Sequence, residues 1–141
     1  TRYRVSHGSG SLETALLALA PKYDVTVEVD NDTHVLSLQG PKSLEILKPH
    51  TPMDLGKLGY FKHGPTTLFG KNVTLARGGY SGERGYEVFC TRADAVSLWD
   101  AILAAGAAYG VVPQSWTCLD IVRVESSLLF YPFDMPHPDT T

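Results

Sequence analysis

The length, composition and charge of this chain exclude several classes of protein. Its 141 residues are enough for one compact domain, and 43% hydrophobic with 19% charged residues is the composition of a globular rather than a disordered chain. The net charge is −3 without any run of lysine or arginine, so neither nucleic acid nor an anionic membrane surface is expected as a partner. No apolar run approaches the roughly 20 residues that span a bilayer.

The cysteines and the two ends of the chain indicate its setting. We expect Cys90 and Cys118 to be reduced and buried, because neither belongs to a Cys-x-x-Cys motif and two cysteines do not make a disulfide scaffold. No signal peptide is visible, so a cytoplasmic location is expected. The start TRYRVSHGSG has no initiating methionine and the end PHPDTT is rich in proline, which favours a part cut from a longer protein.

The first third of the chain predicts one helix and two strands. The stretch SLETALLALA has its apolar residues on one helical face, with Ser11 as N-cap and Pro21 at its end. The run VTVEV, residues 25–29, alternates valine with polar residues, which is typical of a half-buried strand. An Asn-Asp turn separates it from a second such run, HVLSLQG. We therefore expect a β-hairpin over residues 25–39.

The middle of the chain predicts a short helix followed by strands. Pro41 is placed to open the helix in its first turn, and Pro49 limits its length. The segment TPMDLGKLGYFKH carries no clear period. Three further runs, TTLFG, NVTLARG and YEVFC, predict strands.

Two helices are predicted in the last third. The stronger one covers residues 92–105, with Thr91 as N-cap and Asp94 as its partner in a partial capping box. Gly106 ends it. Its expected buried face comprises Ala95, Leu98, Trp99, Ile102 and Leu103. A last helix is expected over about residues 115–128.

Hairpins mixed with helices predict an α+β fold with a mainly antiparallel sheet. We divide the chain into a helical lead-in segment, residues 1–24, and an α+β domain, residues 25–131. Residues 132–141 are interpreted as a proline-rich linker or cut edge.

The stretch RGGYSGERGYEVFC, residues 77–90, admits three interpretations. A phosphate-binding loop is disfavoured, because its glycines would have to lie between a strand and a helix, whereas here strands are predicted on both sides. A plain glycine-rich hairpin is the second possibility. The third is a site built on Glu87, which begins a strand beside the aromatic residues Tyr80 and Tyr86. A partly buried carboxylate must be paired, and it binds two parallel N–H donors well. An arginine or the 2-amino-4-oxo edge of a pterin offers such donors.

Three blocks of the sequence resemble the glycine cleavage system T-protein (aminomethyltransferase) family. They are VLSLQGPKSLEIL, ARGGYSGERGYEVFC and LDIVRVESSLLFY, in the family's order, and the resemblance covers residues 25–131. It implies tetrahydrofolate-dependent transfer of a methyl or aminomethyl group from a small donor, with this chain as the folate-binding central part of a larger multidomain fold. A lipoyl carrier protein is implied as a partner if the chain is a true T-protein.

The resemblance also suggests site residues. Glu87 matches the family glutamate that contacts folate, and Glu83 matches the preceding Gly-Glu, for which support of the loop is the favoured role. Tyr80 and Trp116 are candidate aromatic platforms for the pterin ring, core packing being the alternative for Trp116. The family's catalytic aspartate lies in a segment upstream of these blocks, so the catalytic acid or base is expected outside this chain, and the 141 residues alone are expected to be inactive.

Some positions depart from the family pattern or have simpler explanations. Leu119 stands where the T-protein has an arginine that helps to bind folate, which favours a relative acting on another donor. Asp120 and Arg123 are spaced for an intrahelical ion pair rather than for catalysis. The histidines lack metal-ligand spacing, and His7 is only a candidate substrate contact. A non-catalytic folate-binding or interaction module of the same fold is the alternative function.

Overall fold

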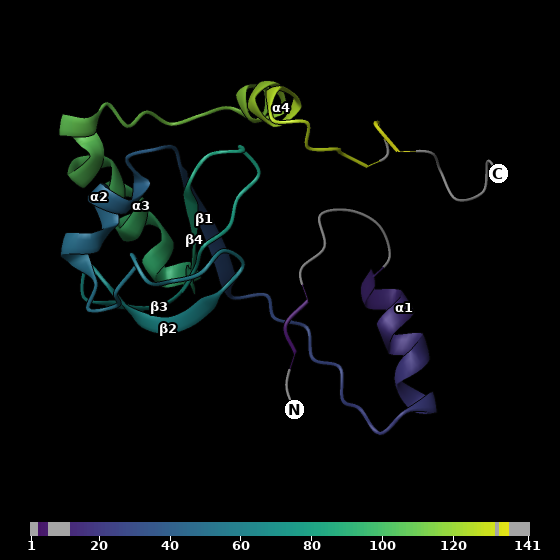
Figure 1. Cartoon of the computed structure of the whole chain (residues 1–141). Coiled ribbons are helices and arrows are strands. Elements are labelled where there is room, and N and C mark those ends of the chain that lie inside the picture. The colour runs from purple at the N-terminus through teal and green to yellow at the C-terminus, as the bar shows by residue number, and fades with distance from the viewer. Residues whose placement is uncertain (1–2, 6–11, 132, 136–141) are drawn as a thin grey trace. The chain divides into compact units, whose positions relative to one another are not determined.

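The computed structural model describes residues 3–5, 12–131 and 133–135, and the chain divides into two units (Figure 1). The first unit, residues 1–31, contains helix α1 (Leu12–Leu19) and a 3₁₀ turn, η1 (Ala20–Lys22). The helix ends just before Pro21, as predicted, and none of its residues is buried. The predicted cap Ser11 and the candidate His7 lie outside the described residues.

The predicted hairpin over residues 25–39 is wrong. Residues 24–31 form no strand, and only the second run does so, as β1 (Thr33–Gln39). The exposed fractions of Val25 and Val29 are 58% and 50%, so nothing buries the apolar face that the alternation would create. Strand β1 finds its partner in β4 instead, much further along the chain.

The second unit, residues 32–141, is built on a four-stranded antiparallel sheet, which confirms the predicted α+β fold. Its strands are β1, β2 (His63–Leu68), β3 (Lys71–Ala76) and β4 (Gly85–Thr91), in the spatial order β1-β4-β3-β2. The three predicted strands of the middle region correspond to β2, β3 and β4, and β2 begins earlier than expected. Strand β1 occupies one edge of the sheet (Figure 1).

Two helices cover one face of this sheet. They are α2 (Ser43–Leu47) and α3 (Arg92–Gly106), which the 3₁₀ turns η2 (Lys48–His50) and η3 (Ala107–Tyr109) extend. Both α2 and α3 pack against β4, and α3 also packs against β1. A further helix, α4 (Trp116–Glu125), follows them in the chain.

Helix α3 is buried along a narrower face than predicted. Leu98 and Ile102 are buried, as predicted, whereas Leu103 is only half-buried and Trp99 is 41% exposed. Thr91 is the N-cap residue, but its hydroxyl bonds the side chain of Asp94 and no backbone N–H of the helix. The expected capping box is therefore absent.

The two faces of the sheet differ because side chains alternate along each strand. One face carries the core, which includes Leu38, Leu75, Tyr86 and Val88, all buried. The other face has no cover from α2 or α3, and its side chains are half-buried or exposed. This open face is formed by Val35, Ser37, Thr74, Ala76, Glu87 and Phe89.

The two cysteines differ in burial. Cys90 is buried in the core, and burial raises the pKa of its thiol. Cys118 is half-buried, not buried as expected, and both cysteines are free. Across the part of the chain that the structure describes, no helix has the length and apolar composition to cross a membrane.

Candidate functional site

Residues 77–84 form the glycine loop, which connects β3 to β4. Because these strands are antiparallel neighbours and no helix follows the loop, it has the geometry of a long hairpin rather than of a phosphate-binding loop. Its last carbonyl, that of Arg84, accepts hydrogen bonds from the N–H of Gly40 and the hydroxyl of Ser43, both at 2.9 Å. Ser43 is itself buried, so the end of the loop is fixed to the start of α2.

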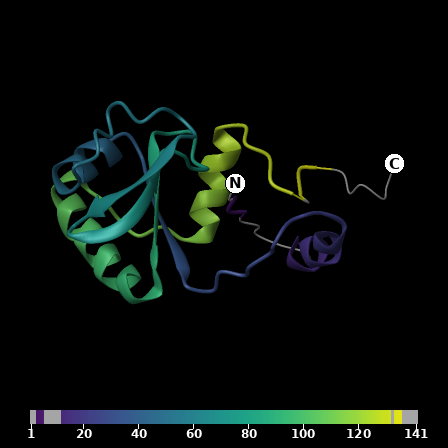
Figure 2. The same ribbon diagram turned by 90° about the horizontal axis from the view of Figure 1, so that it is seen from below.

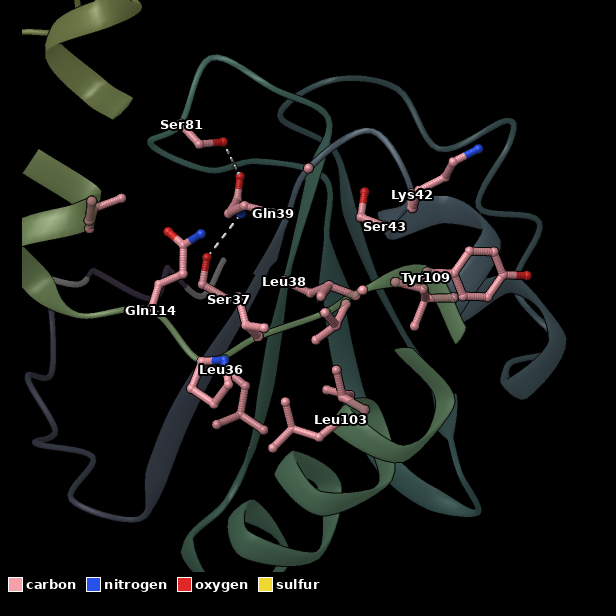
Figure 3. A pocket seen from close by; sticks show the side chains of 18 of the residues that line it. Leu36, Ser37, Leu38, Gln39, Lys42, Ser43, Ser81, Leu103, Tyr109 and Gln114 are labelled. Atoms are coloured by element: carbon pink, nitrogen blue, oxygen red, sulfur yellow. Dashed lines mark hydrogen bonds between the residues drawn. The ribbon is translucent and has the colours of Figure 1, made fainter. Parts of the chain in front are cut away.

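The side chain of Gln39, the last residue of β1, binds the loop from the sheet side. Its amide nitrogen donates to the carbonyl of Gly78 at 3.2 Å and to the hydroxyl of Ser37 at 2.9 Å. Its amide oxygen accepts from the hydroxyl of Ser81 at 2.8 Å (Figure 3). One side chain thereby ties the loop to the edge strand.

The segment after α4 binds the same loop through two further hydrogen bonds. The hydroxyl of Ser126 donates to the carbonyl of Ser81 at 2.9 Å. The hydroxyl of Tyr80 donates to the carbonyl of Leu129. The end of α4 therefore lies against the glycine loop, next to it in Figure 2.

Glu87 lies on the open face, directly after the loop. Its cross-strand neighbours are Ser37 in β1 and Ala76 in β3. The residue is half-buried, and within residues 3–5, 12–131 and 133–135 its carboxylate makes no hydrogen bond or ion pair. A carboxylate that has lost part of its water without gaining a protein donor is chemically suited to bind a ligand that brings its own N–H groups.

Apolar side chains flank this carboxylate. Phe89 is two residues beyond Glu87 in β4, so both side chains lie on the open face. The cross-strand neighbour of Phe89 is Val35 in β1. Both leave part of their surface uncovered. Phe89 is not among the site residues predicted from the sequence, although the i, i+2 spacing within YEVFC already placed it beside Glu87.

In the described part of the chain, none of the other predicted site residues forms a hydrogen bond with the carboxylate of Glu87. Glu83 is exposed, and its backbone N–H, rather than its carboxylate, bonds the hydroxyl of Ser81 at 3.3 Å. The hydroxyl of Tyr80 is engaged with Leu129. Trp116 begins α4, is 72% exposed, and meets the ring of Phe130 edge-on.

A cavity of about 480 Å³ lies along the edge strand β1, between α3 and the chain that leads into α4 (Figure 3). Leu36, Leu38 and Leu103 make its wall apolar, while Ser37 and Gln39 bring polar atoms to one end. Trp116 and Leu119 also line it, but Glu87, Tyr80 and Glu83 do not. The predicted aromatic platform Trp116 thus belongs to this neighbouring cavity.

Arg123 is a structural residue of α4, as its spacing predicted. Its guanidinium is buried, binds Asp120 at 2.7 Å, and also binds Asp134 and the carbonyl of Leu128, the last at 3.1 Å. The N–H of Phe130, and then Arg123, hold the pKa of Asp134 below its usual value. These bonds fold the segment after α4 back onto the helix.

Metal ligands do not cluster in the described ranges, where no group of three His, Cys, Asp or Glu side chains is placed to hold an ion. Among the residues that the structure describes, the chemical features of this region are the hydrogen bonds around the loop and the carboxylate of Glu87, which has no partner there.

Several known proteins are similar to this chain in sequence. It is 48% identical over 132 residues to the heme-dependent oxidative N-demethylase gamma subunit of Ectopseudomonas mendocina, covering 94% of this chain and 35% of that protein. It is 42% identical over 118 residues to the aminomethyltransferase of Streptomyces avermitilis, covering 83% and 32%. With the trimethylamine-oxide aldolase of Ruegeria pomeroyi it shares 39% identity over 110 residues, covering 72% and 14%.

These relatives are much longer than this chain, which spans about a third of the first two. In structure, the chain is similar to a chain of the heterotetrameric sarcosine oxidase from Corynebacterium sp. U-96, with a TM-score of 0.52 and 21% identity over 60% of this chain and 43% of that one. That likeness concerns the fold alone. Residues 3–141 match the GCVT N-terminal domain, so the chain belongs to the GCVT N-terminal domain family of aminomethyltransferase-like proteins.

Proposed function

We propose that this chain is the folate-binding part of a tetrahydrofolate-dependent one-carbon transferase, and that Glu87 binds the pterin. The observation that carries the proposal is the half-buried carboxylate of Glu87, which has no partner within the described residues. The edge of a pterin carries adjacent N–H donors, and an ionised carboxylate accepts two such bonds in parallel. The residues present therefore fit this cofactor.

The surroundings of Glu87 support the same assignment. Phe89 and Val35 place apolar side chains on the open face, two residues along their strands from Glu87 and from its cross-strand neighbour Ser37. A planar ring can pack there while its polar edge meets Glu87. The glycine loop closes one end of this surface, with Gly78 so near that a Cβ atom there would lie 3.8 Å from a carboxylate oxygen of Glu87.

The protein's part in the reaction would be binding and orientation. When bound, tetrahydrofolate supplies the nucleophilic N5 nitrogen that takes up the one-carbon unit. Hydrogen bonds to Glu87 would prevent the pterin ring from rotating within its plane. Packing against Phe89 would prevent the ring from tilting out of that plane. The acid or base that handles the proton is proposed to come from outside this chain.

We infer that the donor is a small N-methylated compound rather than an aminomethyl group on a lipoyl carrier. Relatives of this chain are named as an oxidative N-demethylase and as an aldolase for trimethylamine oxide, a molecule that carries its methyl groups on nitrogen. Leu119, in place of the arginine of the T-protein pattern, agrees with this inference.

A donor screen tests the proposal. The full-length protein would be mixed with tetrahydrofolate and a panel of N-methylated and aminomethylated amines, and one-carbon folates would be measured by chromatography. Product from an N-methylated amine supports the proposal, and product from lipoyl-bound aminomethyl groups alone contradicts the donor class. Tight folate binding without any product would favour the non-catalytic folate-binding module.

A further inference from the structure

We propose that Gln39 and Ser126 are positioning residues that clamp the glycine loop in the shape that presents Glu87 to its ligand. The inference rests on the proposed function for its consequence in binding, but the clamp itself is visible without any ligand. Neither residue is expected to touch the reacting atoms. Their role is to hold Ser81 from two sides.

Gln39 fills space that two glycines leave free. A Cβ atom added at Gly79 or at Gly85 would lie 2.0 Å from the amide oxygen of Gln39, far inside any real contact. Gly85 has an ordinary backbone conformation, so its own φ angle does not require glycine. The demand for glycine at this position comes from the Gln39 amide.

Ser126 does the same at the tip of the loop. A Cβ atom at Gly82 would lie 2.0 Å from the hydroxyl oxygen of Ser126. That hydroxyl donates to the carbonyl of Ser81, while the hydroxyl of Ser81 donates to Gln39. Ser81 is thus held through its side chain by β1 and through its backbone by the segment after α4.

The clamp reaches Glu87 through two of its neighbours, Ser37 and Gly78. The amide nitrogen of Gln39 binds the hydroxyl of Ser37, which faces Glu87 across the strands. The same nitrogen binds the carbonyl of Gly78, where an added Cβ atom would lie 3.8 Å from a carboxylate oxygen of Glu87. If the Gln39 amide leaves its place, Ser37 and Gly78 each lose a hydrogen bond.

A mutant cycle on Gly85 and Gln39 tests this arrangement. Gly85→Ala adds one methyl group that collides with the Gln39 amide, so it should act by expelling that amide. We expect Gly85→Ala and Gln39→Ala each to weaken tetrahydrofolate binding by the full-length protein about fivefold to tenfold. The double variant should bind no more weakly than either single variant, because both remove the same contacts. Additive losses would overturn the proposal.

Ser126 provides an independent arm with a matched control. Ser126→Ala removes the hydrogen bond to Ser81, Ser126→Thr keeps the hydroxyl, and Ser127→Ala removes an adjacent exposed hydroxyl. Hydrogen exchange of residues 78–85, measured without ligand, should accelerate at least about fivefold in Ser126→Ala and in Gln39→Ala. The exchange rate should equal the parental rate in Ser127→Ala, and in Ser126→Thr it should be closer to the parental rate than in Ser126→Ala. Unchanged exchange in Ser126→Ala would refute the clamp even if Gln39→Ala does not fold.

Glu87→Gln, measured beside these variants, separates the two proposals. If Glu87→Gln weakens folate binding while Gln39→Ala and Ser126→Ala bind like the parent, the positioning role is wrong and the proposed function stands. If Glu87→Gln binds like the parent while exchange in the loop accelerates as expected, the clamp stands and the assignment of Glu87 is wrong.

Discussion

Tyr86 and Glu87 are adjacent in β4, and their side chains point to opposite faces of the sheet. Tyr86 is fully buried, and its hydroxyl donates to the carbonyl of Leu55 at 3.2 Å. Glu87 lies on the open face without a partner among the described residues. The buried phenol thus fixes the strand, and the fixed strand holds the carboxylate where a ligand can reach it.

Glu87→Gln should weaken tetrahydrofolate binding by about tenfold to 150-fold, the scale of one charge-assisted hydrogen bond of roughly 1.5–3 kcal/mol. The amide keeps the shape of the side chain but replaces one acceptor with an NH₂ group that faces the donors of the pterin. Titration of the full-length protein, followed by fluorescence, measures the change.

Glu83→Gln is the matched control, because it alters a neighbouring carboxylate that is exposed. It should shift the dissociation constant by less than about twofold. If Glu83→Gln is the more damaging of the two substitutions, the carboxylates have been assigned the wrong way round.

Leu98→Ala should lower the free energy of unfolding by about 2–5 kcal/mol, because it empties a fully buried site between α3 and the sheet. Val96 is on the same helix but 71% exposed, so Val96→Ala should cost less than about 0.5 kcal/mol. Urea denaturation measures both. Equal losses for the two variants would mean that α3 packs through another face.

The sequence alone predicted those helices and strands whose residue pattern is local. The alternation in YEVFC and the helical period after Thr91 correspond to β4 and α3. The same alternation in VTVEV predicted a strand that does not form. A strand needs a pairing partner and a buried face, and neither can be inferred from local periodicity. Pairing between β1 and β4 depends on residues far apart in the chain.

For the candidate site, the sequence pointed to Glu87, whose role in binding stays a prediction. Glu87 stood out through its position and its resemblance to a family residue, and the structure leaves it unpaired among the residues described. The roles of Gln39 and Ser126 could not be read from the sequence, because they arise where distant segments meet at the glycine loop. The reason for glycine at position 85 is likewise a contact, not a backbone angle.

Asp94 should make the stability of the domain depend on pH in the acid range. The side chain of Lys71, at 2.8 Å, and then the hydroxyl of Thr91 hold the pKa of Asp94 below its ordinary value. A lowered pKa in the folded state stabilises the protein above the unfolded value of about 4, and this stabilisation is lost as the pH falls towards the folded value. Asp94→Asn should therefore be less stable than the parent at pH 7.

Urea denaturation at pH 7 and near pH 3 checks this dependence. The difference between the parent and Asp94→Asn should shrink at the lower pH, because the parental carboxylate becomes protonated there. Asp100→Asn, at an exposed position of the same helix, is measured as the control. A gap between parent and Asp94→Asn that widens on acidification would show that the ion pair does not stabilise the fold.

Phe89→Ala should weaken tetrahydrofolate binding by about fivefold to tenfold, the worth of an aromatic contact of roughly 1 kcal/mol. The ring lies on the open face two residues from Glu87, where a pterin bound to that carboxylate would meet it. Phe89→Leu keeps an apolar side chain and should lose less affinity.

Trp116 lines the neighbouring cavity and is mostly exposed, so Trp116→Ala should bind tetrahydrofolate within about twofold of the parent. Isothermal titration of the full-length protein with tetrahydrofolate compares the three variants. If Trp116→Ala binds most weakly and Phe89→Ala binds like the parent, the pterin binds in the cavity along β1 and not on the open face.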